Sequence, residues 1–276
     1  MKKYCIAIKS EKQLNAEILA AVDYVIICPE DYTNPSPLAR YSLYERENTN
    51  KSNSPFFKGG AEGGGFYLNL PIIAMSEDIK VLRRILGNDK VRGKFTGIAA
   101  NNIYALKLAE EYGYKVFKGP WMNTINDNFC DFENIILSPE VTEDEYRLFK
   151  DWDKKNYFLY VYGYLPLMTL AHCPYKVNGF DCITKKCNTA RLQYQDELGN
   201  AMNIRRTRIS KCYFELLNSV PLNLLNYKNK IKPHFFFDMR EEGVGGISKI
   251  LKQFKEPGNK EPGGKYTTGL YFKDLK

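Results

Sequence analysis

Short apolar runs alternate along the chain with segments of helical periodicity, and this alternation constrains the fold more than any other feature. Apolar runs of about four to eight residues predict buried strands, and the helical segments between them predict crossover connections in a parallel sheet. The eight predicted strands are residues 4–9, 23–28, 66–73, 95–100, 115–121, 134–137, 157–162 and 234–238. Eight such units without an internal repeat predict an α/β fold, a (β/α)8 TIM-like barrel, with an open doubly wound sheet as the alternative.

Capping signals mark the ends of several predicted helices. Ser10 and Gln13 have the spacing of a capping box, and so do Thr142 and Glu145. Gly113 directly follows a helical run and predicts a C-terminal cap. The predicted helices cover residues 10–21, 76–86, 103–112, 142–153 and 247–254.

Two long segments interrupt the alternation within what we interpret as one domain, residues 1–276. Residues 31–65 are rich in Asn, Ser, Pro and Gly, and predict a long mobile loop where a barrel normally has a helix. The glycines at 59–65 lack the Lys-Ser/Thr of a phosphate loop and the dinucleotide fingerprint, so a hinge or lid is the better interpretation. Residues 165–233 form an insertion between strands seven and eight, and it begins at the carboxyl end of a strand, where barrels place their chemistry.

Length and composition limit the class of protein. A chain of 276 residues buries a core without needing disulfides or metals for stability. It has no apolar run long enough to span a membrane and no recognisable signal peptide, so we expect a cytoplasmic protein. The net charge of +8 is compatible with an acidic partner such as RNA, and equally with a lysine-rich surface.

Cysteine usage points to metal binding. Seven cysteines, an odd number, are unlike a disulfide framework in a reducing compartment. Four of them lie in the insertion, which is therefore cysteine-bearing: Cys173, Cys182, Cys187 and Cys212. Four thiolates at uneven spacing predict a four-cysteine metal site, and the spacing alone leaves zinc and iron–sulfur open.

The remaining cysteines and the histidine beside the first predicted ligand have simpler interpretations. Cys5 and Cys28 lie inside apolar strands, and Cys130 lies in a short aromatic segment, so all three are predicted to be small core residues. His172 precedes Cys173 directly and is either a structural residue or a donor to the site.

Several short segments repeat the order and residue types of a known family. Apart from the four cysteines, they are residues 137–142, 162–168, 172–174, 195–199, 217–222, 237–240 and 267–272. Together they resemble the barrel and cysteine region of peptidase family U-32, over most of residues 66–276. The terminal segment departs from the family pattern, with Leu270 in place of a histidine.

The resemblance implies an iron–sulfur protein. The family is named for collagenase-like proteolysis, but several members are linked to oxygen-independent hydroxylation of tRNA, ribosomal RNA or ubiquinone precursors. Those members carry a 4Fe–4S cluster on four cysteines, and prephenate is implicated as their oxygen donor. The positions here that match the cluster ligands are Cys173, Cys182, Cys187 and Cys212. We therefore expect a hydroxylase-type enzyme, or its subunit, that acts on RNA or a small anionic molecule, with a protein partner chain as a further option.

Polar residues at predicted strand ends are candidates for the site. They are Asn69, Asn123, Glu140, Tyr162 and Arg240. Arg240, together with Arg206 or Arg208, is expected to bind the carboxylates of a small acid, because a guanidinium contacts a carboxylate through two bonds. Glu140 is a candidate general acid or base. Each of them has the alternative role of a strand cap or an ion-pair partner.

Two other functions stay open. A peptidase, metal-dependent or cysteine-type, has little support, because the chain has only His172 and His234, no His-Glu-x-x-His and no serine nucleophile elbow. The second alternative is a non-catalytic binding module whose insertion is stapled by zinc.

Overall fold

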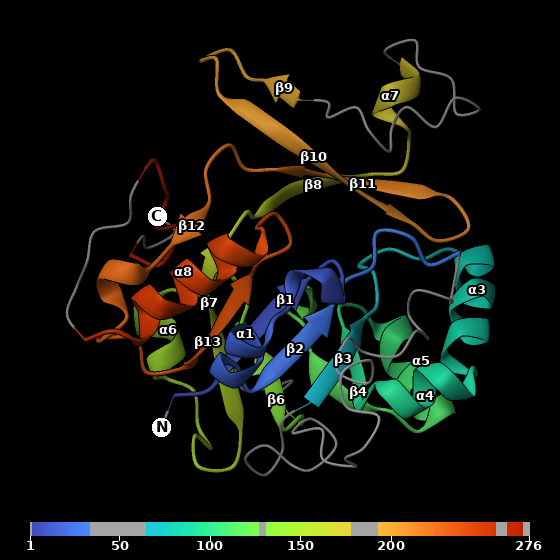
Figure 1. Ribbon diagram of the computed structural model, residues 1–276, viewed down its shortest axis with the longest axis horizontal. Helices are drawn as coiled ribbons and strands as arrows, with labels where there is room; N and C mark the ends of the chain where they lie inside the picture. Colours follow the sequence, from blue (N-terminus) through green and yellow to red (C-terminus); the bar gives the residue numbers. More distant parts are fainter. Residues whose placement is uncertain (1, 34–64, 127–130, 178–192, 258–263, 273–276) are drawn as a thin grey trace.

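The computed structural model describes residues 2–33, 65–126, 131–177, 193–257 and 264–272. Within these residues, eight parallel strands close into a barrel (Figure 1). In order around it they are β1 (Tyr4–Ile8), β2 (Tyr24–Ile27), β3 (Gly65–Asn69), β4 (Gly97–Ala100), β5 (Lys115–Lys118), β6 (Asn134–Ile136), β7 (Asn156–Gly163) and β13 (His234–Asp238). Strand β13 pairs with both β1 and β7, and β7 also pairs with β6, so the ring is complete. The predicted barrel is confirmed over the open sheet.

Helices cover the outside of the barrel. The described ones that follow barrel strands are α1 (Ala16–Ala21), α3 (Ser76–Leu86), α4 (Asp89–Lys94), α5 (Ile103–Tyr112), α6 (Glu143–Arg147) and α8 (Val244–Lys255). Helices α3 and α5 have their predicted ends, and Gly113 caps α5 in the left-handed region at φ 69°. None of the described helices is both long and apolar enough to cross a membrane.

Two predicted helices are shorter than expected. The first becomes a 3-10 turn, η1 (Glu11–Gln13), followed by α1, because the side chain of Asn15 accepts a hydrogen bond from the Ile18 N–H and starts a new helix. Helix α6 ends at Arg147 instead of continuing to residue 153, and Asp151 then has a positive φ of 56° that a helix does not accommodate. Both predicted capping boxes are present.

Toward the amino-terminal ends of the strands, which we call the lower end, a layer of aromatic rings fills the interior of the barrel. Tyr24, Tyr67, Phe117 and Phe158 are buried, and their neighbouring ring centroids are 5.2 to 6.2 Å apart. Aromatic rings in edge-to-face and tilted contact fill a barrel densely. Further toward the carboxyl ends, β1 and β4 carry only the small side chains of Ala7 and Ala99, which leaves space above the layer. Cys5 is fully buried, as predicted for a core residue.

The insertion folds into a second, antiparallel sheet that lies across the carboxyl end of the barrel (Figure 1). Its strands are ordered β8 (Pro166–Leu170), β11 (Cys212–Leu217), β10 (Ala201–Arg208) and β9 (Gln193–Gln195), and we call it the cap sheet. The short helix α7 (Pro174–Val177) follows β8, and β12 (Leu222–Asn223) pairs with β7 on the barrel. Residues 34–64 of the predicted mobile loop, with Cys130, Cys182 and Cys187, lie outside the described residues.

Asp78, near the start of α3, fastens the cap sheet to the barrel. Its carboxylate is fully buried and accepts hydrogen bonds from the Ser210 N–H at 2.9 Å and from the hydroxyls of Ser210 and Tyr213. Burial alone would raise the pKa of Asp78, but these bonds, with one from the Met75 N–H, lower it. A carboxylate with this many donors stays ionised, so the turn between β10 and β11 is held on α3.

Candidate functional site

A pocket lies between the cap sheet and the carboxyl ends of the barrel strands. The pocket and the open solvent at its mouth together take up about 880 Å³. Each barrel strand, or the residue just after it, contributes to the lining: Ala7, Ile26, Asn69, Ala99, Gly119, Ile136, Tyr160 and Phe236. Other lining residues include Cys28, Asn101, Trp121 and Arg240, and the cap sheet adds Thr169, Arg205, Arg206, Thr207, Tyr213 and Glu215. This is where barrels place their active sites.

The register of the cap sheet explains which of its side chains meet the pocket. Glu215 of β11 pairs with Arg205 of β10 on one side and with Thr169 of β8 on the other. Two residues further along β10, Thr207 pairs with Tyr213 of β11. Because alternate residues of a strand point to the same side, all five lie on the face toward the barrel.

Arg205 joins the cap sheet to the barrel through a buried ion network. Its side chain is only 3% exposed. Nε lies 2.7 Å from Glu215 Oε2, and Nη1 lies 3.4 Å from Asp238 Oδ2 and 3.7 Å from Glu241 Oε1. An arginine without these carboxylates would not be stable in this position.

Arg240 is already engaged by Asp238, the residue two positions before it. Its Nε and Nη2 donate to the two carboxylate oxygens of Asp238 at 2.7 and 2.6 Å, and the Tyr160 hydroxyl donates to the same carboxylate at 3.0 Å. Burial would raise the pKa of Asp238, but the guanidinium groups of Arg240 and Arg205 outweigh it and hold that pKa far below its usual range. In the same way, Arg205 and Arg240 lower the pKa of Glu215 against the effect of burial. Both carboxylates are therefore ionised at neutral pH.

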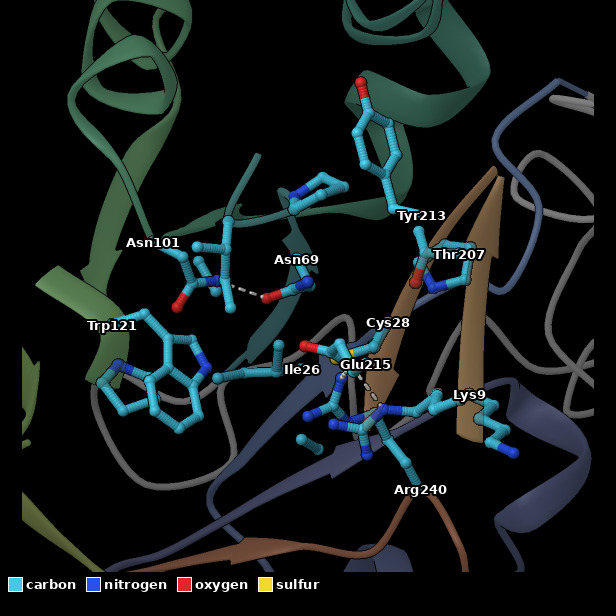
Figure 2. Close-up of a pocket in the computed structure, with 18 of the residues that line it drawn as sticks. Lys9, Ile26, Cys28, Asn69, Asn101, Trp121, Thr207, Tyr213, Glu215 and Arg240 are labelled. Atoms are coloured by element: carbon cyan, nitrogen blue, oxygen red, sulfur yellow. Dashed lines mark hydrogen bonds and ion pairs between the residues drawn. The ribbon is translucent and has the colours of Figure 1, made fainter. Parts of the chain in front are cut away.

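Two buried polar atoms in the pocket lining have no hydrogen-bond partner among the described residues. One is Nη2 of Arg205 and the other is Oδ1 of Asn101. The amide nitrogen of Asn101 donates to Asn69 Oδ1 at 2.8 Å and to the Leu70 carbonyl at 3.0 Å, which fixes the oxygen on the opposite side. Figure 2 shows that oxygen turned away from Asn69, on the Trp121 side of the pocket. The protein itself covers both atoms, so neither is exposed to the pocket as it stands.

The structure brings only some of the sequence-predicted site residues to this pocket. Arg240, Asn69 and Arg206 line it, whereas Arg208 does not. Tyr162 is buried outside the lining and donates to Glu242 Oε1 at 2.7 Å. Asn123 is exposed in a left-handed turn at φ 45°, and Glu140 belongs to a turn in which its N–H meets Ser138 Oγ. Neither of these two borders the pocket.

Sequence reasoning missed Arg205, Glu215, Asn101 and Trp121 as lining residues. Asn101 carries a signal that could have found it, because it directly follows a predicted strand just as Asn69 ends one. The alternation of β10 and β11 hides Arg205 and Glu215 among other charged residues, and only their pairing across the sheet reveals the inward face.

The two described cysteines of the predicted metal site lie at one end of the cap sheet. Cys212 begins β11, and Cys173 stands between β8 and α7; both are half-buried. The last Cα pair of β8 and β11 is Leu170 with Phe214, so both cysteines lie just beyond it at the same end. The part of the chain that the structure describes holds two of the four predicted ligands and no group of three potential metal-binding side chains.

Basic residues adjoin Cys212 in the cap sheet. Cys212 shares its side of β11 with Phe214, whose ring lies 6.0 Å from that of Tyr175 in α7, so its thiol is on the face away from the pocket. Arg208 pairs with Cys212 in the sheet, and Lys211 directly precedes it. Nearby cations favour thiolates and an anionic cluster.

Cys28 is the one cysteine in the described lining of the pocket, and it is not an activated nucleophile. Burial raises its pKa to about 12, against the smaller opposing effect of Arg240. His234 begins β13, at the opposite end of the barrel from Cys28, and burial lowers the pKa of that imidazole to about 4. The pocket therefore offers a protonated thiol without a histidine base, which is unlike a cysteine peptidase.

Comparisons with family models, curated proteins and solved structures find no match to this chain. The resemblance to peptidase family U-32 therefore stays a prediction, and the fold and the pocket are the basis on which a function is inferred.

Proposed function

We propose that this protein is an iron–sulfur enzyme that modifies an organic substrate held in the barrel mouth, by oxygen-independent hydroxylation in which prephenate, the donor that the family resemblance implies, supplies the oxygen. One observation carries the proposal: the sheet that closes the pocket is also the sheet that bears Cys173 and Cys212. Cys182 and Cys187 would complete the ligand set for a 4Fe–4S cluster.

The cluster and the pocket would occupy opposite faces of the cap sheet. Cys212 lies on the outer face, and its neighbour Tyr213 lines the pocket on the inner face. When bound, the cluster would supply or accept one electron at a time. The side chains of the chain itself would bind and orient the substrate and exclude water from it.

The pocket is suited to hold a substrate in one orientation. Arg205, Asp238 and Arg240 hold one another in place through short charge-assisted bonds, so the polar wall does not need to rearrange when a substrate binds. The Asp78 contacts keep the cap closed over it. A preorganised, enclosed wall of this kind is typical of an active site rather than of a purely structural module.

The test is anaerobic purification, followed by a visible spectrum and measurement of iron, sulfide and zinc. A brown protein with about four irons per chain, lost in Cys182→Ala, is the expected result. Cys28→Ala is the matched control, because this thiol lies in the pocket and not among the proposed ligands, and its iron content should be unchanged.

Stoichiometric zinc in a colourless protein would contradict the proposal and support the zinc-stapled module. Protein without metal that also takes up no cluster on reconstitution with iron and sulfide would contradict both.

A further inference from the structure

The cap sheet turns a polar face toward the barrel and an apolar face outward. Its residues that face the pocket include Thr169, Arg205, Thr207, Tyr213 and Glu215. Met168, Ile204 and Leu216 alternate with them and point the other way, because successive side chains of a strand lie on opposite faces. A sheet with one solvated face normally buries its apolar side. The cap sheet has the reverse arrangement, so its outward face needs a cover.

The apolar side chains of the outward face are contiguous. One row crosses three strands, because Met168 of β8 pairs with Leu216 of β11, and Leu216 pairs with Ile204 of β10. The neighbouring row toward β9 is the pair of Met202 and Tyr194. Met168 is 51% exposed and Tyr194 38%, and the other three are half-buried. Single apolar residues are common on a surface, whereas a contiguous group of them marks an interaction site.

The two ends of the outward face carry opposite charge. At one end the acidic turn, residues 196–200 between β9 and β10, presents Glu197 and the 87% exposed Leu198. Asp196 fixes this turn, since its carboxylate accepts from the N–H groups of Leu198 and Asn200 at 2.9 and 2.8 Å. The described cations at the other end, which we call the basic end, are Lys176, Arg206, Arg208 and Lys211. Asp31, 3.8 Å from Arg208, offsets one of them.

This face is complementary to a second copy of itself. In Figure 1, α7 and β9 lie at opposite ends of the cap, and the eight residues of β10 separate the two ends by roughly 25 Å. A two-fold axis across the strands at the row of Met168, Leu216 and Ile204 places that row of one copy on the same row of the other. The rotation also places each acidic turn over the partner's basic end. An axis along the strands would instead place like charges opposite each other.

We propose that the protein forms a two-fold dimer in which the outward faces of two cap sheets pack on each other, as the two sheets of a β-sandwich do. The pockets lie under the inward faces, so the contact does not close them. Cys173 and Cys212 lie beyond the pair of Leu170 and Phe214, at the α7 end and outside the central apolar row. The inference goes beyond the proposed function and does not use the cluster, so metal-free protein tests it by itself.

Sedimentation velocity of the full chain measures the association. The natural protein at about 50 µM should have twice the chain's mass of 31.9 kDa. Met168→Glu places two like charges near each other at the two-fold axis, and it should weaken the dimer at least about tenfold. Leu148→Glu is the matched control, because this leucine is 76% exposed at the end of α6 on the barrel, and its replacement should leave the mass unchanged.

A charge reversal tests the orientation of the two copies. Glu197 and Lys176 are both exposed, at opposite ends of the face, and the two-fold arrangement brings each of them toward the other residue of the partner copy. Glu197→Lys and Lys176→Glu should therefore each weaken the dimer, because each places like charges opposite each other. The variant with both changes exchanges the two charges and should regain the dimer.

A single-chain mass at every concentration up to about 200 µM would overturn the proposal, and another part of the chain or a different protein would then cover the face. A dimer that Met168→Glu leaves intact would overturn it as well, since that dimer would use another surface. Failure of the double charge reversal to regain the dimer would overturn the two-fold arrangement. Failure to take up iron and sulfide would count against the proposed function alone.

Discussion

The two ends of the barrel interior are built from opposite kinds of side chain. The lower end is a layer of four aromatic rings that contact one another. The upper end, under the cap sheet, holds two arginines and two carboxylates in direct contact. Burial of apolar area in the aromatic layer stabilises the fold. Burial of the charged network costs desolvation free energy and holds the charges in fixed positions. The comparison shows that the aromatic layer stabilises the fold, whereas the charged network holds the polar side chains of the pocket in fixed positions.

Removal of a ring from the aromatic layer should have the largest effect on the free energy of unfolding. Phe117→Ala should lower the free energy of unfolding by about 3–5 kcal/mol, because this fully buried ring contacts three of its neighbours and leaves a cavity. Urea unfolding measures it. Phe272→Ala is the control: this ring is 48% exposed, and its loss should cost much less. Equal losses in both variants would show that a ring of the aromatic layer stabilises the fold no more than a half-exposed ring does.

Removal of one carboxylate from the charged network should lower the free energy of unfolding slightly less, and it should also disturb the pocket. Asp238→Asn leaves Arg205 and Arg240 without their shared carboxylate, and we expect a loss of about 3 kcal/mol. The polar wall of the pocket should lose its fixed arrangement, because Arg205 and Arg240 lose the carboxylate they share. A variant as stable as the natural protein would contradict the view that this network is fully formed.

The cap sheet should loosen before the barrel does. Asp78→Ala removes the acceptor for Ser210 and Tyr213, and we expect a loss of about 2 kcal/mol. Amide hydrogen exchange should speed up in β10 and β11 and stay unchanged in β1. Uniform acceleration in all three strands would mean that cap and barrel unfold as one unit.

The last prediction concerns pH at the amino-terminal end of the barrel, and its effect is small at neutral pH. Burial lowers the pKa of His234 to about 4, with smaller contributions from Lys3 and Lys2. The unfolded chain therefore binds a proton near pH 6.5 that the folded chain does not bind until about pH 4, so stability is full above pH 6.5 and falls as the pH drops between these values. His234→Asn should flatten this part of the pH dependence of unfolding. An unchanged slope would show that His234 is not its source.

The sequence predicted the barrel well because each β/α unit is encoded locally. Helices α3 and α5 begin and end at their predicted residues, and the eight strands overlap their predicted ranges. The cap sheet was not predictable in the same way. Its register depends on long-range pairs such as Leu170 with Phe214, and no local pattern in β10 indicates which of its arginines faces inward.

The candidate site was predicted in part for the same reason. The rule that polar residues gather at strand ends found Asn69 and Arg240, which line the pocket, and also selected Asn123 and Glu140, which do not. The end of a strand fixes where its backbone lies, but it does not fix the direction of the side chains that follow. At Asn123 the backbone turns in the left-handed region, and the side chain is exposed. For Arg240 the position was right, but its bidentate bond to Asp238 occupies the guanidinium nitrogens that the prediction assigned to a small acid.

Anomalous X-ray diffraction at the iron and zinc edges, on crystals grown without oxygen, tests the central claim most directly. The account predicts iron peaks beside Cys173 and Cys212, on the outer face of the cap sheet, and none inside the pocket below it. A zinc peak at that position, or no metal there in protein reconstituted with iron and sulfide, would contradict the claim that the sheet closing the barrel mouth carries the cluster.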